Sequence, residues 1–253
     1  MHYSTGLSKR QTDDLFTLVE KEFLAGGSAQ KFPPILGLFE SMLIAVRYLR
    51  TNHTETEIAE TIGVSQATVS RAITALTPLL ERALARLIPV AEDVDLTQSV
   101  IIDGTLLPCW TWKKHPELFS GKHKTTGYNV QVACDLTGRV LWVSDPVDGR
   151  RHDTAALAAS GLLTNQDTRI HLGDKGYQGT HMITPIKKLP GQDLHESEKL
   201  FNKQVNKLRY VVERGIAHLK NWKALHTDYR RPLNTFAATI TAAIGLYFLT
   251  ALE

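Results

Sequence analysis

The sequence predicts an α/β fold, a mixed sheet with helices on its faces, preceded by an all-α region. Apolar residues recur at helical spacing from residue 36 to 87, whereas short β-branched runs begin after residue 97. Between these patterns, Ile88 to Thr97 collects a proline and three acidic residues, which is typical of a linker. We therefore expect a helical domain at 1–94 and an α/β domain at 95–253.

The elements follow from the apolar pattern in chain order. Helices are expected through residues 36–87, then strands near 100–102, 128–132 and 140–143. A helix near 153–160, a strand at 169–172 and a long amphipathic helix at 201–219 follow. The last segment, 235–252, has no charged residue; its threonines and all-round apolar surface favour a buried core helix over a membrane span.

Composition excludes several classes of protein. With 253 residues, 43% of them hydrophobic and 22% charged, the chain can bury a core and is not disordered. Two cysteines cannot build a disulfide framework, and the N-terminus lacks a signal-peptide pattern, so the cytoplasm is the expected compartment. Net charge rises from −3 in residues 1–95 to +5 in residues 187–253. The basic end suits a polyanion, although it also suits a solvated surface.

Residues 54–71 have the layout of a DNA-binding helix-turn-helix. Gly63 can adopt the left-handed turn conformation and Ser65 is a favourable N-cap for the second helix. We expect Gln66, Thr68 and Arg71 on the exposed face of that helix, where they would contact bases in the major groove. The alternative is a structural corner that binds no DNA.

Three carboxylates stand at positions that suit one site. Asp103 directly follows the run 100–102, Asp174 follows the strand expected at 169–172, and Glu213 lies beside the apolar stripe of the long helix. Carboxylates from two strands and a helix suit two Mg²⁺ ions, with Mn²⁺ as a substitute, which favours phosphodiester chemistry.

Each of these carboxylates also has a purely structural explanation. The aspartates could cap turns, and Glu213 could pair with Arg209 one helical turn earlier.

Several motifs together resemble the DDE transposases of the PIF/Harbinger and related bacterial insertion-sequence group. They cover most of the chain from about residue 36, and they are Leu49–Thr51 leading into Gly63–Gln66, Val69–Arg71, Ile102–Thr105, Gly121–Lys124 with Asn129, Gly149–Asp153, Gly173–Tyr177, Val212–Arg214, and Leu219–Lys220. One departure is Arg150–Arg151, where the family more often has a small residue after the glycine.

The resemblance implies a ribonuclease H-like catalytic domain whose metal-binding triad is Asp103, Asp174 and Glu213. It implies a transposase that binds the terminal inverted repeats and target DNA, hydrolyses phosphodiesters and then transfers strands. We expect a homodimer or larger assembly on DNA, in the bacterial cytoplasm at the nucleoid, with no membrane partner.

Basic residues flank the expected triad. Lys122, Lys124 and Lys175 are expected to hold DNA phosphates, or else to offset acidic repulsion or remain solvated. Asp153 follows His152 in a family-like motif and could act near the metals or cap a helix. The alternative functions are a domesticated DDE endonuclease and a DNA-binding regulator without transposition.

Overall fold

The computed structural model describes residues 2–26, 31–110, 114–164 and 166–251. Its contacts divide the chain into two compact units. The helical unit combines Met1–Ile88 with Leu219–Glu253, and the sheet unit is Pro89–His218. The N-terminal border lies near the one expected at residues 94 and 95. The expected second domain at 95–253 needs a correction, because its last segment packs with the N-terminal helices.

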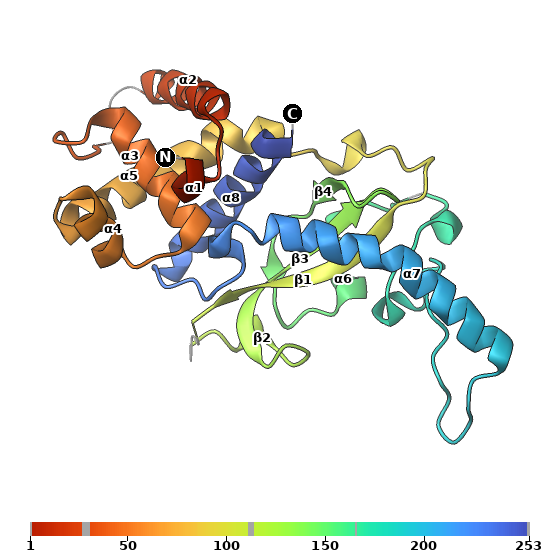
Figure 1. Ribbon diagram of the computed structural model, residues 1–253. Helices are drawn as coiled ribbons and strands as arrows, with labels where there is room; N and C mark the ends of the chain where they lie inside the picture. The colour runs from red at the N-terminus through yellow and green to blue at the C-terminus, as the bar shows by residue number, and fades with distance from the viewer. Residues whose placement is uncertain (1, 27–30, 111–113, 165, 252–253) are drawn as a thin grey trace. The chain divides into compact units, whose positions relative to one another are not determined.

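The helical unit is built from helices that pack in pairs, chiefly α5 with α8 and α3 with α5. Its α-helices are α1 (His2–Thr5), α2 (Lys9–Ala25), α3 (Gly37–Thr51), α4 (Glu55–Ile62), α5 (Gln66–Leu84) and α8 (Phe236–Ala251), and its short 3₁₀ helices are η1 (Ala85–Leu87), η6 (Lys223–Leu225) and η7 (Leu233–Thr235). Figure 1 labels the α-helices.

Helix α8 explains why the end of the chain belongs to this unit. The segment Leu233–Ala251 is long and apolar enough to cross a membrane by length and composition alone, a property that core helices share. Buried residues lie around most of the circumference of α8, among them Ile240, Ile244, Gly245, Leu246 and Phe248. A helix that is apolar all round favours burial on several sides, and α8 packs mainly against α5.

The sheet unit contains a five-stranded sheet in its described residues, centred on β3. Antiparallel pairing joins β3 to each of the other strands. The strands are β1 (Ile101–Cys109), β2 (Phe119–Ser120), β3 (Thr125–Cys134), β4 (Val140–Val143) and β5 (Val147–Asp148). The three expected strands are therefore present, and β1 and β3 are longer than expected.

The strand expected at 169–172 is absent as a regular element. A 3₁₀ turn, η4 (Thr168–Ile170), occupies its first residues, and only Leu172 forms isolated parallel bridges, to Ile101 and Ile183. Main-chain hydrogen bonds still hold this segment beside β1: Ile102 N donates to Leu172 O at 2.8 Å and Leu172 N to Val100 O at 2.9 Å. The mixed character of the sheet rests on this short parallel pairing.

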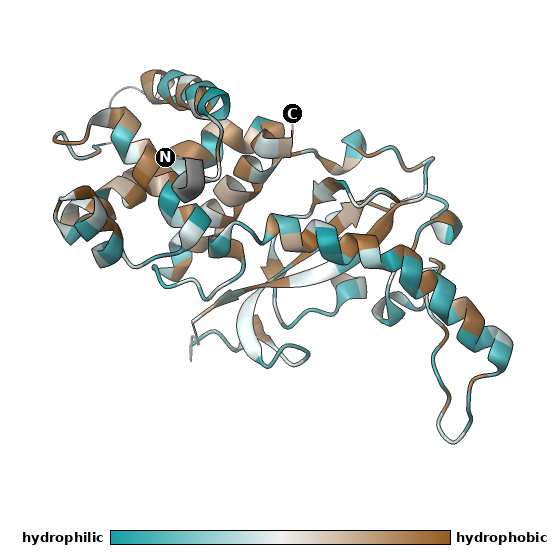
Figure 2. Ribbon diagram, in the orientation of Figure 1, coloured by the Kyte–Doolittle hydropathy of each residue, from teal (hydrophilic) through white to brown (hydrophobic). Residues whose placement is uncertain are grey.

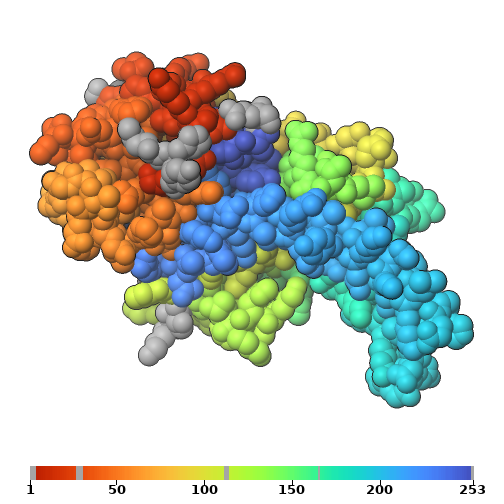
Figure 3. Space-filling model, in the orientation of Figure 1, coloured from red at the N-terminus to blue at the C-terminus, as the bar shows by residue number. Residues whose placement is uncertain are grey.

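Helices complete the sheet unit. Helix α6 (Asp153–Ser160) has the bounds that the sequence predicts, and it packs on β3. The long helix α7 (Glu196–Leu219) begins before the expected residue 201. Polar and apolar residues alternate along it in Figure 2, and Figure 3 shows it on the outside of the unit. The remaining short 3₁₀ helices are η2 (Ala91–Asp93), η3 (Pro116–Leu118) and η5 (Lys175–Tyr177).

Candidate active site and nucleic-acid surface

The parallel pairing of Leu172 with Ile101 brings two aspartates together. In parallel strands the register advances equally on both chains, so Asp103 and Asp174 come side by side, two residues beyond the paired positions. Asp103 lies within β1, opposite Val132 of β3, rather than at the end of a strand. The interpretation of Asp103–Gly104 as a turn pair is therefore wrong.

Asp103 is a desolvated carboxylate, since its side chain is 15% exposed. Its Oδ1 accepts a hydrogen bond from Gly104 N at 2.9 Å, and its Oδ2 accepts one from Arg209 Nη2 at 3.3 Å. Burial raises the pKa of Asp103 to about 6; Arg209 and Lys122 oppose this rise, and the charge of Asp174 adds to it. Arg209 therefore pairs with Asp103. The alternative in which Arg209 pairs with Glu213 is wrong.

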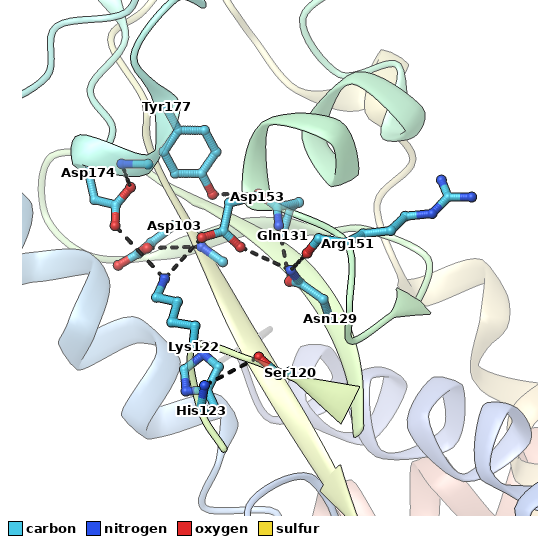
Figure 4. A network of polar contacts seen from close by, with 12 residues as sticks. Asp103, Ser120, Lys122, His123, Asn129, Gln131, Arg151, Asp153, Asp174 and Tyr177 are labelled. Atoms are coloured by element: carbon cyan, nitrogen blue, oxygen red, sulfur yellow. Dashed lines mark hydrogen bonds and ion pairs between the residues drawn. The ribbon is translucent and has the colours of Figure 1, made fainter. Parts of the chain in front are cut away.

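Lys122 lies among three carboxylates, as Figure 4 shows. Its Nζ donates to Asp153 Oδ2 at 3.0 Å and lies 4.0 Å from Asp174 Oδ2. Asp174 also caps η5, because its Oδ1 accepts from Gly176 N at 2.6 Å. Burial alone would lower the pKa of Lys122, but the hydrogen bond to Asp153 and the charges of Asp153, Asp174 and Asp103 raise it.

Asp153 is held from its other side by a polar network. Asn129 Nδ2 donates to Asp153 Oδ1 at 2.9 Å, Gln131 Nε2 donates to Asn129 Oδ1 at 3.2 Å, and the Tyr177 hydroxyl donates to Gln131 Oε1. A Cβ atom at Gly104 would lie 2.4 Å from Asp153 Oδ1, so the carboxylate can approach β1 only beside a glycine. Asp153 is the first residue of α6 and His152 is its N-cap, so the suggested capping role is wrong.

Glu213 lies on α7, one turn after Arg209, and its side chain is exposed. Two residues further along, α7 packs closely on β3, since a Cβ at Gly215 would lie 2.9 Å from Cys134 Sγ. In the described residues, no three His, Cys, Asp or Glu side chains form a group that could hold a metal ion. The structure therefore brings Asp103 and Asp174 together with Asp153 (Figure 4), and Glu213 lies exposed on α7.

The other basic residues predicted here have different surroundings. Lys124 and Lys175 have exposed side chains. A cavity of about 400 Å³ opens beside Asp153, and Lys122, Asn129 and Arg151 also line it. The neighbouring surface thus offers both cationic and polar groups to a ligand.

The helical unit contains the turn predicted between residues 62 and 66. Gly63 has a φ of 79°, and its N–H donates to Ala59 O at 2.9 Å. The Ser65 side chain accepts from Thr68 N at 3.2 Å at the start of α5. Both local predictions, the left-handed glycine and the N-cap serine, are confirmed.

The residues predicted to contact DNA lie at the start of α5. Gln66 and Arg71 are exposed, and the Thr68 hydroxyl is 2.9 Å from that of Ser65. Gln66 Nε2 donates to Glu55 Oε2. Arg231, from the segment before α8, also pairs with Glu55.

Gln66, Glu55 and Arg231 line a second cavity, of about 590 Å³. Its lining includes Tyr48, Gln66, Ser70, Arg230 and Arg231. The C-terminal segment therefore adds two arginines beside the face of α5 that carries Gln66. The sequence analysis predicted no role for these two arginines.

Sequence reasoning also missed the network that holds Asp153. One signal was available, because Asn129 and Gln131 are polar residues two apart in an otherwise apolar strand and must lie on the same face. Their hydrogen bonds to Asp153 and Tyr177 could not be read from the sequence, since they join three separate segments, β3, α6 and η5.

Comparison with known proteins gives a family match and similarities to named proteins. Residues 102–247 match the family described as DDE superfamily endonuclease. A protein of Streptomyces albus G, named as a transposase for insertion sequence element IS112, is 33% identical over 223 residues, covering 87% of this chain and 83% of the relative. One of Microchaete diplosiphon, named for element IS702, is 28% identical over 225 residues, covering 85% and 81%. No solved structure gives a significant match.

Proposed function

Because the chain belongs to the DDE superfamily endonucleases, we propose that it is a DNA transposase that binds transposon ends, hydrolyses phosphodiesters and transfers strands. Its similarity to the IS112 and IS702 transposases supports the general role. The observation that carries the chemical part is the parallel register that sets Asp103 beside Asp174. We assign the ribonuclease H-like fold to the sheet unit as part of the same proposal.

The donor set fits a divalent cation. Asp103 and Asp174 offer only carboxylate oxygens, which Mg²⁺ and Mn²⁺ prefer, and the Lys122 ammonium already occupies their neighbourhood as a cation. We propose that Asp103, Asp174 and Glu213 hold two Mg²⁺ ions, with Mn²⁺ as a substitute. Bound there, the ions would activate the attacking hydroxyl and stabilise the leaving oxygen.

The protein's own groups prepare this site. Arg209 holds the Asp103 carboxylate through Oδ2, while the Gly104 N–H fixes Oδ1. Gly176 N–H holds one oxygen of Asp174 and leaves the other toward Lys122. The carboxylates are therefore oriented by hydrogen bonds before a ligand arrives, which lowers the cost of ordering them on binding. Arg209 Nε is buried without a hydrogen-bond partner in the described residues and could serve an anionic ligand.

For DNA binding we propose the turn and the second helix of the 54–71 segment. Gln66, Thr68 and Arg71 would face the major groove, and Lys122, Lys124 and Lys175 would contact phosphates near the scissile bond. Partners would be the terminal inverted repeats and target DNA, bound by a homodimer or larger assembly at the nucleoid of a bacterial cytoplasm.

The test uses labelled DNA that carries the sequences flanking the coding gene, with a target plasmid and Mg²⁺. Joined products are expected for a transposase, cleavage alone for a domesticated endonuclease, and binding alone for a regulator. Glu213→Gln should abolish cleavage and leave DNA binding intact, because it removes a proposed ligand from an exposed position. Glu198→Gln, in the first turn of the same helix, is the matched control and should cleave normally. Normal cleavage by Glu213→Gln would remove Glu213 from the site.

A further inference from the structure

The ammonium of Lys122 stands where the proposed function requires a metal cation. It is 3.0 Å from Asp153 and 4.0 Å from Asp174, and the charge of Asp103 also acts on it. Three carboxylates in one neighbourhood repel one another, so a nearby cation stabilises the arrangement. In Figure 4 the Lys122 side chain extends toward this group.

Asp153 determines where this cation lies. Its side chain is 12% exposed, and both of its oxygens are engaged, one by Asn129 and the other by Lys122. The fully buried Gln131 and Tyr177 hold Asn129 in turn, and Gly104 leaves the space that Asp153 fills. By contrast, the Lys122 side chain is 55% exposed and can swing into solvent.

We propose that Lys122, positioned by Asp153, is a built-in counter-cation of the metal-free site, and that a divalent cation displaces it. The proposal rests on the proposed function, since it assumes that Asp103 and Asp174 bind metal. Lys122 then has two states: it neutralises carboxylates before metal arrives, and afterwards its ammonium is available to a phosphate. Asp153 acts as a positioning residue for the first state.

Competition between Lys122 and a divalent cation predicts the direction in which metal affinity changes when Lys122 is replaced. Removing the ammonium removes the repulsion that an incoming ion meets. A single and a double charge about 6 Å apart repel by about 1.4 kcal/mol even in water, which is about tenfold in affinity. Lys122→Met should therefore bind Mn²⁺ about tenfold more tightly than the wild type in calorimetric titration. Lys122→Arg, which keeps the charge, should retain near wild-type affinity.

Thermal unfolding gives a second readout. Without metal, Lys122→Met should unfold at a lower temperature than the wild type, because the carboxylates lose their counter-cation. Saturating Mn²⁺ should remove this difference in unfolding temperature, because a ligand that binds the folded state stabilises it. Lys175→Met removes the same charge one residue after Asp174, where no side-chain contact to a carboxylate is described, and should show much smaller changes in both measurements.

Asp153→Asn separates positioning from metal binding. If Asp153 only holds Lys122, its substitution should raise Mn²⁺ affinity in the wild-type background and change little in the Lys122→Met background. Lower affinity in both backgrounds would make Asp153 a metal ligand and overturn its positioning role.

The two proposals fail differently. If Mn²⁺ binds neither the wild type nor Asp103→Asn, the metal site of the proposed function fails. If Mn²⁺ binds the wild type but not Asp103→Asn, and Lys122→Met has wild-type affinity, the counter-cation proposal alone fails.

Discussion

Replacing Asp103 by asparagine should stabilise the metal-free protein at neutral pH. The Asp103 side chain in β1 is only 15% exposed, and this desolvation raises its pKa from 3.8 to about 6 despite Arg209 and Lys122. Asparagine is nearly isosteric, and its oxygen can still accept from Gly104 N or Arg209. The substitution therefore removes a desolvated charge and keeps the shape of the site.

The raised pKa sets both the magnitude and the pH window. A rise from 3.8 to about 6 corresponds to roughly 3 kcal/mol. Because the pKa is higher in the folded state, this stability is fully present below pH 3.8 and is lost as pH rises through 6. At pH 7.5 the ionised Asp103 therefore lowers the free energy of unfolding by up to about 3 kcal/mol. Asp103→Asn should recover most of that amount.

Urea unfolding in EDTA at several pH values measures this effect. The variant should have a higher free energy of unfolding than the wild type at pH 7.5, and this difference should shrink between pH 6 and 4. Asp135→Asn is a control in which the change in stability should have the opposite sign. Burial would raise the pKa of Asp135, but hydrogen bonds from Thr137 and Arg139 outweigh it and lower the pKa. The Asp135→Asn variant should therefore lose stability at neutral pH. A destabilised Asp103→Asn at pH 7.5, with no pH dependence, would refute the reasoning.

Three further outcomes are expected. Gln66→Ala or Arg71→Ala should weaken specific binding by about 1–3 kcal/mol per lost base contact, read as flattened preference at one base position in a binding assay; uniform loss would indicate phosphate contacts. Ca²⁺ should support DNA binding without turnover, because it prefers 6–8 ligands at about 2.3–2.6 Å, whereas Mg²⁺ and Mn²⁺ should support cleavage; equal rates in Ca²⁺ would contradict this. Gly104→Ala should displace Asp153 and reduce cleavage with DNA binding retained, since its Cβ would meet Asp153 Oδ1 at 2.4 Å; normal cleavage rates would show that the site tolerates the shift.

Local features were predictable from the sequence because they depend on neighbouring residues. The left-handed Gly63, the Ser65 cap and the helix starting at Asp153 each follow from a few adjacent side chains. The strand expected at 169–172 was wrong because only Leu172 pairs there, through isolated bridges to Ile101 and Ile183, segments that the local pattern does not reveal.

Contacts between residues far apart in the sequence could not be predicted from its apolar pattern. The apolar surface of 235–252 predicted burial but could not say that α5 covers it. Likewise, the pairing of Arg209 with Asp103 joins residues more than one hundred positions apart, so the pattern of α7 alone offered Glu213 as its partner. The assignment of Glu213 to the site stays a prediction.

The division of the helical unit between the two ends of the chain has a consequence for its synthesis. Residues 89–218 are an insertion within that unit, and they leave the ribosome before α8 does. Domains that emerge first usually fold first, yet here α5 waits for a covering helix that begins at Phe236. The sheet unit can therefore complete its folding while the N-terminal helices still lack their C-terminal partner, which makes the apolar surface of α5 a candidate for chaperone capture during translation.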